Sequence, residues 1–200
     1  MNAHDRRMTA MAAARDNPAP FSGREPPNNL EAEQALLGAL LVNNEAYGRI
    51  IPTGIEAKHF HEPIHRVFFE AIRECIAAKR IANPVTIRSF VAPSELTKPV
   101  GDMSTAQYAA RLAGDAVSII NAPDYAEAII FYARRREVLP AADIIEHAAF
   151  SAEDEIAFAD ELREARDRLT HVLYAVERRD EDHGSFAGTA GFNIWDEHLC

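Results

Sequence analysis

The segment Pro26–Val42, PPNNLEAEQALLGALLV, decides the fold of this chain because it combines a helix start with a wide apolar face. The two prolines favour an extended approach, and Asn28 or Asn29 can accept hydrogen bonds from the free N–H groups of the first turn. Glu31 and Glu33 then place negative charge at the positive end of the helix. Five leucines make the apolar stripe broad: Leu30, Leu36, Leu37, Leu40 and Leu41. A stripe of this width predicts a helix buried against other helices.

Gly38 lies in the middle of this leucine-rich face. Glycine inside a helix costs about 1 kcal/mol relative to alanine, so its presence needs a compensating reason. Because glycine has no Cβ, it lets another backbone approach closely. We therefore expect another segment of backbone to pass close to Gly38.

Further helical patterns follow at short spacing. The clearest lies in HEPIHRVFFEAIRECIAAKR, where these apolar residues recur three or four positions apart: Ile64, Val67, Phe68, Ala71, Ile72, Cys75 and Ile76. Pro93–Asp102 has the composition of a turn-rich connector. Ser104 or Thr105 can then start another helix. Because no convincing alternating strand is present, the sequence predicts a compact all-α domain over about residues 26–118.

Residues 119–179 have the pattern of two long helices joined by a short loop. Asn121–Asp124 provides a cap followed by a first-turn proline, and Ser151–Asp154 provides a second start with acidic residues. Each helix carries one apolar seam, which predicts an antiparallel hairpin. Pro140 lies inside the first helix, where it removes a hydrogen bond and crowds the carbonyl four residues earlier. We therefore expect a kink or a break near Arg136.

A two-helix hairpin has too little material to cover a long apolar seam. A second copy of the same hairpin is the simplest partner, because a two-fold axis brings the same apolar surface of both copies into contact. The sequence thus predicts a homodimer whose contact residues are Tyr125, Ile129, Tyr132, Leu139, Leu162, Leu169 and Val172.

The composition limits the possible partners. The net charge of −10 over 200 residues repels a phosphate backbone, so we expect no direct binding to DNA. No apolar run is long enough to cross a bilayer, and the first twenty residues have no hydrophobic signal core, which predicts a cytoplasmic protein. Residues 1–25 have the composition of a flexible arm, and residues 180–200 that of a linker.

Nucleotide chemistry is not expected from this sequence. A phosphate-binding loop needs a glycine followed by lysine and then serine or threonine, since its backbone N–H groups and its lysine hold the phosphates. The three lysines, Lys58, Lys79 and Lys98, do not follow a glycine. We therefore expect no catalytic residue, no cofactor and no ATPase activity in this chain.

Two local patterns have a chemical alternative. His61-Glu62-Pro63-Ile64-His65 matches the H-E-x-x-H pattern of zinc hydrolases. That pattern needs one continuous helical turn, whereas Pro63 is most comfortable at the start of a helix, so the structural interpretation is preferred. Similarly, Arg134–Arg136 is either a phosphate contact or, as we prefer, a charged helix face.

The chain resembles the N-terminal domain of DnaB-type replicative DNA helicases over about residues 26–178. Pro26–Leu41 follows PP-x-x-x-EAEQ-x-LLG-x-LL, and NAPDYAEAIIFYARRREVL, from Asn121, is similar to the family's N-x-x-x-YA-x-I-I-x-E-x-x-x-RR-x-L. His59–Phe68 and Gly101–Leu112 resemble two further family segments, although Asp102 replaces a glycine.

The resemblance implies a hairpin that pairs N-terminal domains, a trimer of such dimers in a hexameric collar, and docking of a DnaG-type primase. It also implies that ATP and Mg belong to a motor domain that follows this region in the family. The last ten residues, GFNIWDEHLC, resemble the beginning of that motor. A stand-alone or phage-borne regulator that enters helicase rings is the alternative within the same resemblance.

Overall fold

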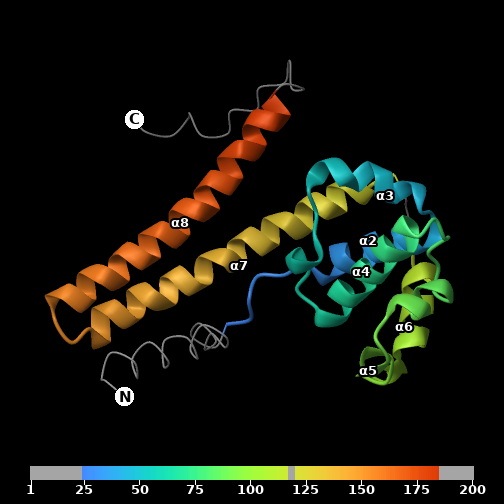
Figure 1. The fold of residues 1–200 in the computed structure, drawn as a ribbon, viewed down its shortest axis with the longest axis horizontal. Coiled ribbons are helices and arrows are strands. Elements are labelled where there is room, and N and C mark those ends of the chain that lie inside the picture. The colour runs from blue at the N-terminus through green and yellow to red at the C-terminus, as the bar shows by residue number, and fades with distance from the viewer. Residues whose placement is uncertain (1–23, 117–119, 185–200) are drawn as a thin grey trace, which may run out of the picture. The chain divides into compact units, whose positions relative to one another are not determined.

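The computed structural model describes residues 24–116 and 120–184, with side chains as far as residue 177, and is mainly helical (Figure 1). The predicted arm at residues 1–25 and the predicted linker at residues 180–200 lie mostly outside these residues. The elements in chain order are α2 (Leu30–Val42), α3 (Glu45–Ile50), η2 (Ile51–Thr53), η3 (Ala57–His59), α4 (Pro63–Ala77), η4 (Thr86–Phe90), α5 (Pro93–Leu96), β1 (Pro99–Val100), β2 (Met103–Ser104), α6 (Thr105–Gly114), α7 (Ala122–Ser151) and α8 (Glu155–Gly184). Within the described ranges, each helix is too short or too polar to cross a membrane.

The chain divides into two compact units, residues 1–136 and residues 137–200. This boundary lies later than the one predicted near residue 118. The reason is that the first turns of α7 contribute Ala122, Ala126 and Ile129 to the apolar core of the first unit. The predicted all-α fold is confirmed, and the base of the hairpin belongs to the bundle.

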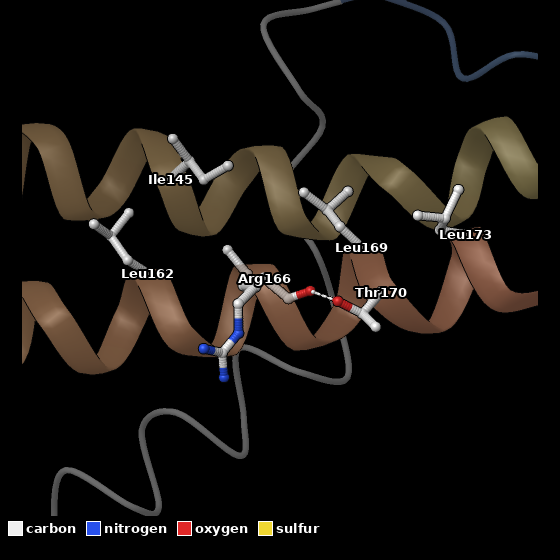
Figure 2. A pocket seen from close by; sticks show the side chains of 7 residues that line it. Ile145, Leu162, Arg166, Leu169, Thr170 and Leu173 are labelled. Atoms are coloured by element: carbon white, nitrogen blue, oxygen red, sulfur yellow. Dashed lines mark hydrogen bonds between the residues drawn. The ribbon is translucent and has the colours of Figure 1, made fainter.

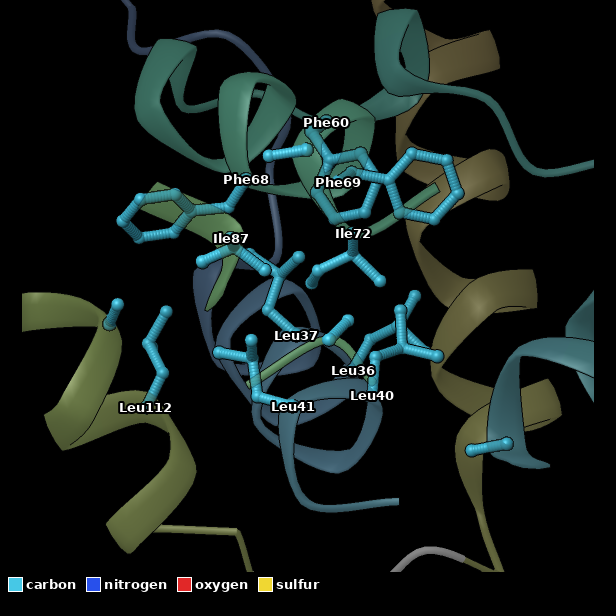
Figure 3. Close-up of a cluster of buried hydrophobic side chains, with 14 of the residues drawn as sticks. Leu36, Leu37, Leu40, Leu41, Phe60, Phe68, Phe69, Ile72, Ile87 and Leu112 are labelled. Carbon is cyan, nitrogen blue, oxygen red and sulfur yellow. The ribbon is translucent and has the colours of Figure 1, made fainter. Parts of the chain in front are cut away.

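Helix α2 forms the centre of the first unit, as its sequence predicts. Asn29 caps it, since its side-chain oxygen accepts a hydrogen bond of 3.0 Å from the N–H of Ala32. Leu36, Leu37 and Leu40 are fully buried among side chains from α4, η4 and α6 (Figure 3). Burial of each leucine contributes roughly 1.5–3 kcal/mol to stability.

The predicted close approach at Gly38 is confirmed. A Cβ built on Gly38 would lie 2.3 Å from the backbone oxygen of Leu112 in α6. No larger residue fits without moving one of the two helices. Glycine here therefore sets the separation of α2 and α6.

The other helix starts also follow the sequence signals. Pro63 is the first residue of α4, so its missing N–H costs no helical hydrogen bond. Ser104 and Gln107 form a reciprocal capping box at the start of α6. The segment predicted as a turn-rich connector also contains α5 and β1, and β1 pairs antiparallel with β2 around Gly101 at φ 59°.

Helix α7 is continuous through Pro140. The break predicted as one outcome near Arg136 is therefore absent. Proline still leaves the carbonyl of Arg136 without its usual helical donor, because proline has no N–H. The division between the two units falls directly after Arg136.

Candidate functional site

The second unit is an antiparallel pair formed by the later half of α7 and by α8. Asp154 caps α8, since its carboxylate accepts a hydrogen bond of 2.8 Å from the N–H of Ala157. Near the loop, Nδ1 of His147 on α7 lies 2.9 Å from a carboxylate oxygen of Glu161 on α8. The start signal at residues 151–154 and the antiparallel arrangement agree with the sequence prediction.

An open apolar groove of about 430 Å³ runs along this pair (Figure 2). Its lining is formed by Ile145, Leu162, Ala165, Arg166, Leu169, Thr170 and Leu173. Ala165 is buried, whereas the exposed fractions of Leu162 and Leu173 are 38% and 55%. A row of half-exposed leucines on a helix pair is typical of a protein interaction site rather than of a catalytic one.

The predicted contact residues differ in exposure, and only Ile129 among them is fully buried. Leu162 and Leu169 are exposed in the groove, and Val172 beside them is half-buried. Residues Tyr125, Tyr132 and Leu139 on α7 are all half-buried.

Ile129 requires a correction. Its side chain is only 1% exposed and packs in the core of the first unit, so it is not available to a second copy. The periodicity of α7 identifies an apolar seam correctly but does not say that the bundle covers its beginning.

Sequence reasoning missed two of the apolar side chains that α7 leaves exposed, Phe131 and Val138. Phe131, Val138 and Ile145 are 57%, 38% and 42% exposed and repeat every seven residues. In the sequence, this seven-residue spacing indicates that the three residues lie on one side of a helix. The period alone does not separate this exposed repeat from the buried seam beside it, because both have the same spacing.

The arginines of Arg134–Arg136 have structural partners. Arg136 donates from Nη1 to the carbonyl oxygen of Pro27 at 2.8 Å and from Nη2 to that of His59 at 2.5 Å. The guanidinium of Arg135 lies over the rings of Phe131 and Tyr132, 5.8 and 5.3 Å from their centroids. These contacts favour a structural role over phosphate binding.

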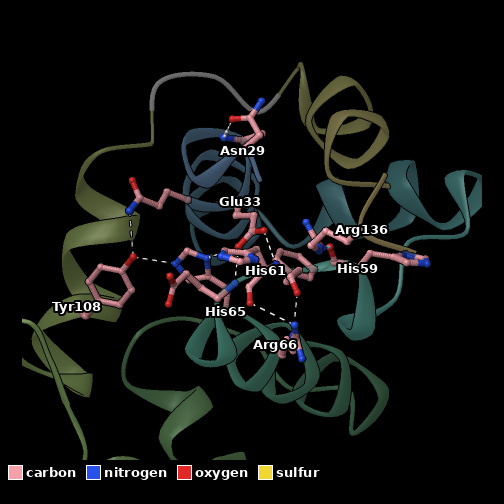
Figure 4. A network of polar contacts seen from close by, with 12 residues as sticks. Asn29, Glu33, His59, His61, His65, Arg66, Tyr108 and Arg136 are labelled. Carbon is pink, nitrogen blue, oxygen red and sulfur yellow. Dashed lines mark hydrogen bonds and ion pairs between the residues drawn. The ribbon is translucent and has the colours of Figure 1, made fainter. Parts of the chain in front are cut away.

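A buried polar network joins α2, α4 and α6 in the first unit (Figure 4). The carboxylate of Glu33 accepts hydrogen bonds from Nδ1 of His65 at 2.7 Å and from the N–H of His61 at 2.5 Å. Since a carboxylate can only accept, Nδ1 of His65 carries a proton. Its Nε2 lies 2.8 Å from the hydroxyl of Tyr108, which also accepts a hydrogen bond from Gln34.

This network does not have the geometry of the zinc-hydrolase alternative. His61 lies before α4, outside the helical turn that would present both histidines together. Both ring nitrogens of His65 already contact Glu33 and Tyr108. Over the described residues, His, Cys, Asp and Glu side chains form no group of three that could hold a metal ion.

The shifted pKa values of Glu33 and His59 bear on the stability of this region in acid. Burial opposes the charge of Glu33, but hydrogen bonds from His65 and from the N–H groups of His61 and Glu62 outweigh it, so the pKa of Glu33 is lowered. For His59, burial and the nearby positive charges of Lys58, Arg134 and Arg136 lower the pKa to about 4.

These shifts predict a loss of stability in acid. Between pH 6.5 and about 4 the unfolded chain binds a proton at His59 that the folded chain does not, so the free energy of unfolding falls as pH decreases. Below pH 4.5, Glu33 acts in the same direction. Urea unfolding at several pH values should show this decrease. His59→Asn, whose side-chain oxygen can accept the N–H of Glu56 as Nδ1 does, should have a flatter profile above about pH 4, and an unchanged slope would contradict the assignment.

Comparisons with known proteins agree with these observations. The family model for the DnaB-like helicase N terminal domain matches residues 25–130. The replicative DNA helicase DnaB of Rickettsia felis is 31% identical over 163 residues, which cover 80% of this chain and 31% of that protein. DnaB of Geobacillus stearothermophilus is 29% identical over 138 residues, covering 68% of this chain and 29% of that protein. The chain thus spans about a third of the length of these curated relatives.

Solved structures share the fold. The N-terminal domain of DnaB helicase from Mycobacterium tuberculosis has a TM-score of 0.62 and 21% identity, covering 74% of this chain and 99% of that chain. A DnaB-like replicative helicase, solved in a study of its interactions with primase, has a TM-score of 0.52 and 19% identity, covering 84% of this chain and 36% of that chain.

Proposed function

Because the chain belongs to the family of DnaB-like helicase N-terminal domains, we propose that it is the self-associating and primase-docking part of a replicative helicase. The exposed groove of the second unit carries this proposal. In this function the chain contributes assembly, and ATP hydrolysis and strand separation belong to a motor domain that a full-length helicase would supply.

The apolar side chains of the hairpin support self-association. Leu162, Leu169 and Leu173 on α8 are between 37% and 55% exposed, with Ile145 of α7 on the other side of the groove. Burying each such side chain against a second copy contributes up to about 1.5–3 kcal/mol to the free energy of association. The contributions of several residues per copy can together stabilise a dimer. A second identical groove offers an apolar surface of the same length and spacing.

Replacing Leu162 and Leu169 by aspartate tests this function. We expect the double variant to shift from dimer to monomer, because each dimer loses four apolar side chains and gains four charges at the contact. The dimer dissociation constant should rise at least about 100-fold. Light scattering at several protein concentrations measures the change, and circular dichroism checks that the variant stays helical.

Ile81→Asp is the matched control. Ile81 is 74% exposed on the loop after α4, in the other unit, so it places one aspartate on an apolar surface that is not the groove. The molar mass of the Ile81→Asp variant in light scattering should equal that of the wild type. A wild-type chain that is monomeric, or a double variant that stays dimeric, would contradict self-association through this groove.

Primase docking is the second part of the proposed function. Its support is membership of the family, together with the fold shared with the helicase studied for its interactions with primase. A pull-down or calorimetric titration with the C-terminal domain of a DnaG-type primase tests it, and we expect binding to the assembled protein. Absence of binding by assembled wild-type protein would remove this part and leave self-association intact.

A further inference from the structure

We propose that the segment of residues 79–88, which leads from α4 into η4, is a docking surface for a peptide segment of a partner protein. That partner segment combines acidic residues with large apolar side chains. The 79–88 surface belongs to the first unit and shares no residue with the hairpin groove, so the inference does not depend on the proposed function. Its basis is a pair of exposed aliphatic side chains, a local excess of positive charge and a strained lysine.

The 79–88 surface exposes two aliphatic side chains. Ile81 and Val85 are each 74% exposed, whereas Ala82 and Ile87 in the same segment are 0% and 1% exposed and belong to the apolar core. The buried pair holds the segment on the bundle, and the exposed pair stays in contact with water. Covering two such side chains is favourable, so they are suited to contact apolar side chains of another molecule.

Hydrogen bonds fix the backbone of this segment. The side-chain oxygen of Asn83 accepts from the N–H of Thr86 at 3.0 Å, and the hydroxyl of Thr86 donates to the carbonyl oxygen of Ile81 at 2.6 Å. The side-chain amide of Asn44 donates to the carbonyl oxygen of Ala82 at 2.8 Å and accepts from its N–H at 2.7 Å. Binding therefore requires little further ordering of the backbone, which favours affinity.

The surface is positively charged in an otherwise acidic chain. Residues 75–94 form the longest stretch of the sequence without aspartate or glutamate, and they include Lys79, Arg80 and Arg88. All three basic residues are exposed. Glu74 on α4 and Glu45 at the start of α3 adjoin the segment, so positive charges outnumber negative ones here, whereas the whole chain has a net charge of −10.

Lys79 has a backbone conformation that usually belongs to glycine. Its φ is 56°, in the left-handed region. Its N–H donates to the carbonyl oxygen of Ile76 at 2.8 Å, and the N–H of Arg80 donates to that of Cys75 at 3.0 Å, which is the helix ending in which glycine is preferred. A lysine at this position is strained, because its Cβ is crowded in the left-handed region. Use of its positive charge in binding explains why a strained residue is present.

The net charge of the chain favours an acidic partner segment for this surface. A basic partner would be attracted to many parts of a chain with a net charge of −10. An acidic partner is repelled by most of that chain and attracted by the 79–88 surface, so charge directs it to one place. Ile81 and Val85 then select partners that also carry large apolar side chains.

Three synthetic peptides test the class of partner: acidic and apolar EELFDWLEEL, basic and apolar KKLFKWLKKL, and acidic and polar EESSDSSEES. Fluorescence anisotropy of each labelled peptide, titrated with the full chain, measures binding. We expect EELFDWLEEL to bind, more weakly as salt increases, and EESSDSSEES not to bind measurably. In NMR spectra of the labelled protein, the amide signals of residues 79–88 should shift with EELFDWLEEL and not with KKLFKWLKKL.

Val85→Asp tests the apolar part of the surface. It should weaken binding of EELFDWLEEL at least about 10-fold, because it removes an apolar contact and adds a negative charge. Ile156→Asp is the matched control, since Ile156 is also 74% exposed but lies on α8. This control variant should bind the peptide as the wild type does.

Lys79→Gly separates binding from stability. Glycine adopts the left-handed conformation without strain, so the variant should unfold at a higher urea concentration than the wild type. It should nevertheless bind EELFDWLEEL about 2–5-fold more weakly, because one exposed positive charge is lost. A lysine with only a structural role would not give this opposite pair of effects.

The docking surface is supported if EELFDWLEEL binds, shifts the signals of residues 79–88 and is weakened by Val85→Asp. No binding of this peptide, shifts confined to other residues, or equal weakening by Val85→Asp and Ile156→Asp overturns it. Light scattering of the wild type tests self-association independently, so failure of the docking surface leaves the proposed function standing.

Discussion

His65→Ala should lower the free energy of unfolding of the first unit by about 3–5 kcal/mol, a large part of the 5–15 kcal/mol typical of a domain. His65 is 0% exposed and connects the carboxylate of Glu33 to the hydroxyl of Tyr108. Removing its ring leaves a buried carboxylate with fewer donors and a cavity between the helices. Urea unfolding followed by circular dichroism measures the loss.

Lys98→Ala is the control for this prediction. The ammonium of Lys98 lies 2.6 Å from Glu95, but its side chain is 64% exposed, so water screens the ion pair. Its removal should cost no more than about 1 kcal/mol. A His65→Ala variant as stable as Lys98→Ala would show that the buried network does not hold the three helices together.

Gly38→Ala should destabilise the first unit, although alanine is the better helix former. The gain in helix propensity is about 1 kcal/mol, but the new Cβ would overlap the backbone oxygen of Leu112, which cannot rotate away as a side chain can. Separating α2 from α6 opens the core around Leu36 and Leu37. We expect a net loss of about 1–3 kcal/mol in denaturant unfolding.

Gly48→Ala provides the matched comparison. Gly48 lies inside α3, and a Cβ built there meets nothing within 4 Å. This substitution should stabilise the protein by up to about 1 kcal/mol, since only the propensity and chain-entropy gains remain. Equal effects of the two substitutions would contradict the close crossing of α2 and α6.

Local chemistry made much of the fold predictable. The cap at Asn29, the first-turn position of Pro63 and the capping box at Ser104 depend on residues within one helical turn of each other. The close approach of another backbone at Gly38 was predictable, because glycine lowers helix stability and few other reasons explain it within an apolar helix face. The short pairing of β1 with β2 escaped prediction because two-residue strands carry no alternating pattern.

The candidate site was less predictable, because exposure depends on the neighbours of a helix and not only on its own period. Ile129 and Ile145 both fit an apolar period on α7, yet the first is buried by the bundle and the second faces the groove. Likewise, Glu33 looks in the sequence like a surface charge at a helix start, and only its position beside His65 makes it part of the core.

The sequence by itself determined where α2, α4 and α6 begin, that the fold is all-α, and that α7 and α8 form a hairpin, because hydrogen-bond capping and apolar periodicity act over a few residues. The tertiary structure decided which apolar side of α7 stays exposed, where the bundle ends along that helix, and which polar side chains are buried. Those outcomes depend on contacts between residues far apart in the chain, whose partners no local pattern specifies.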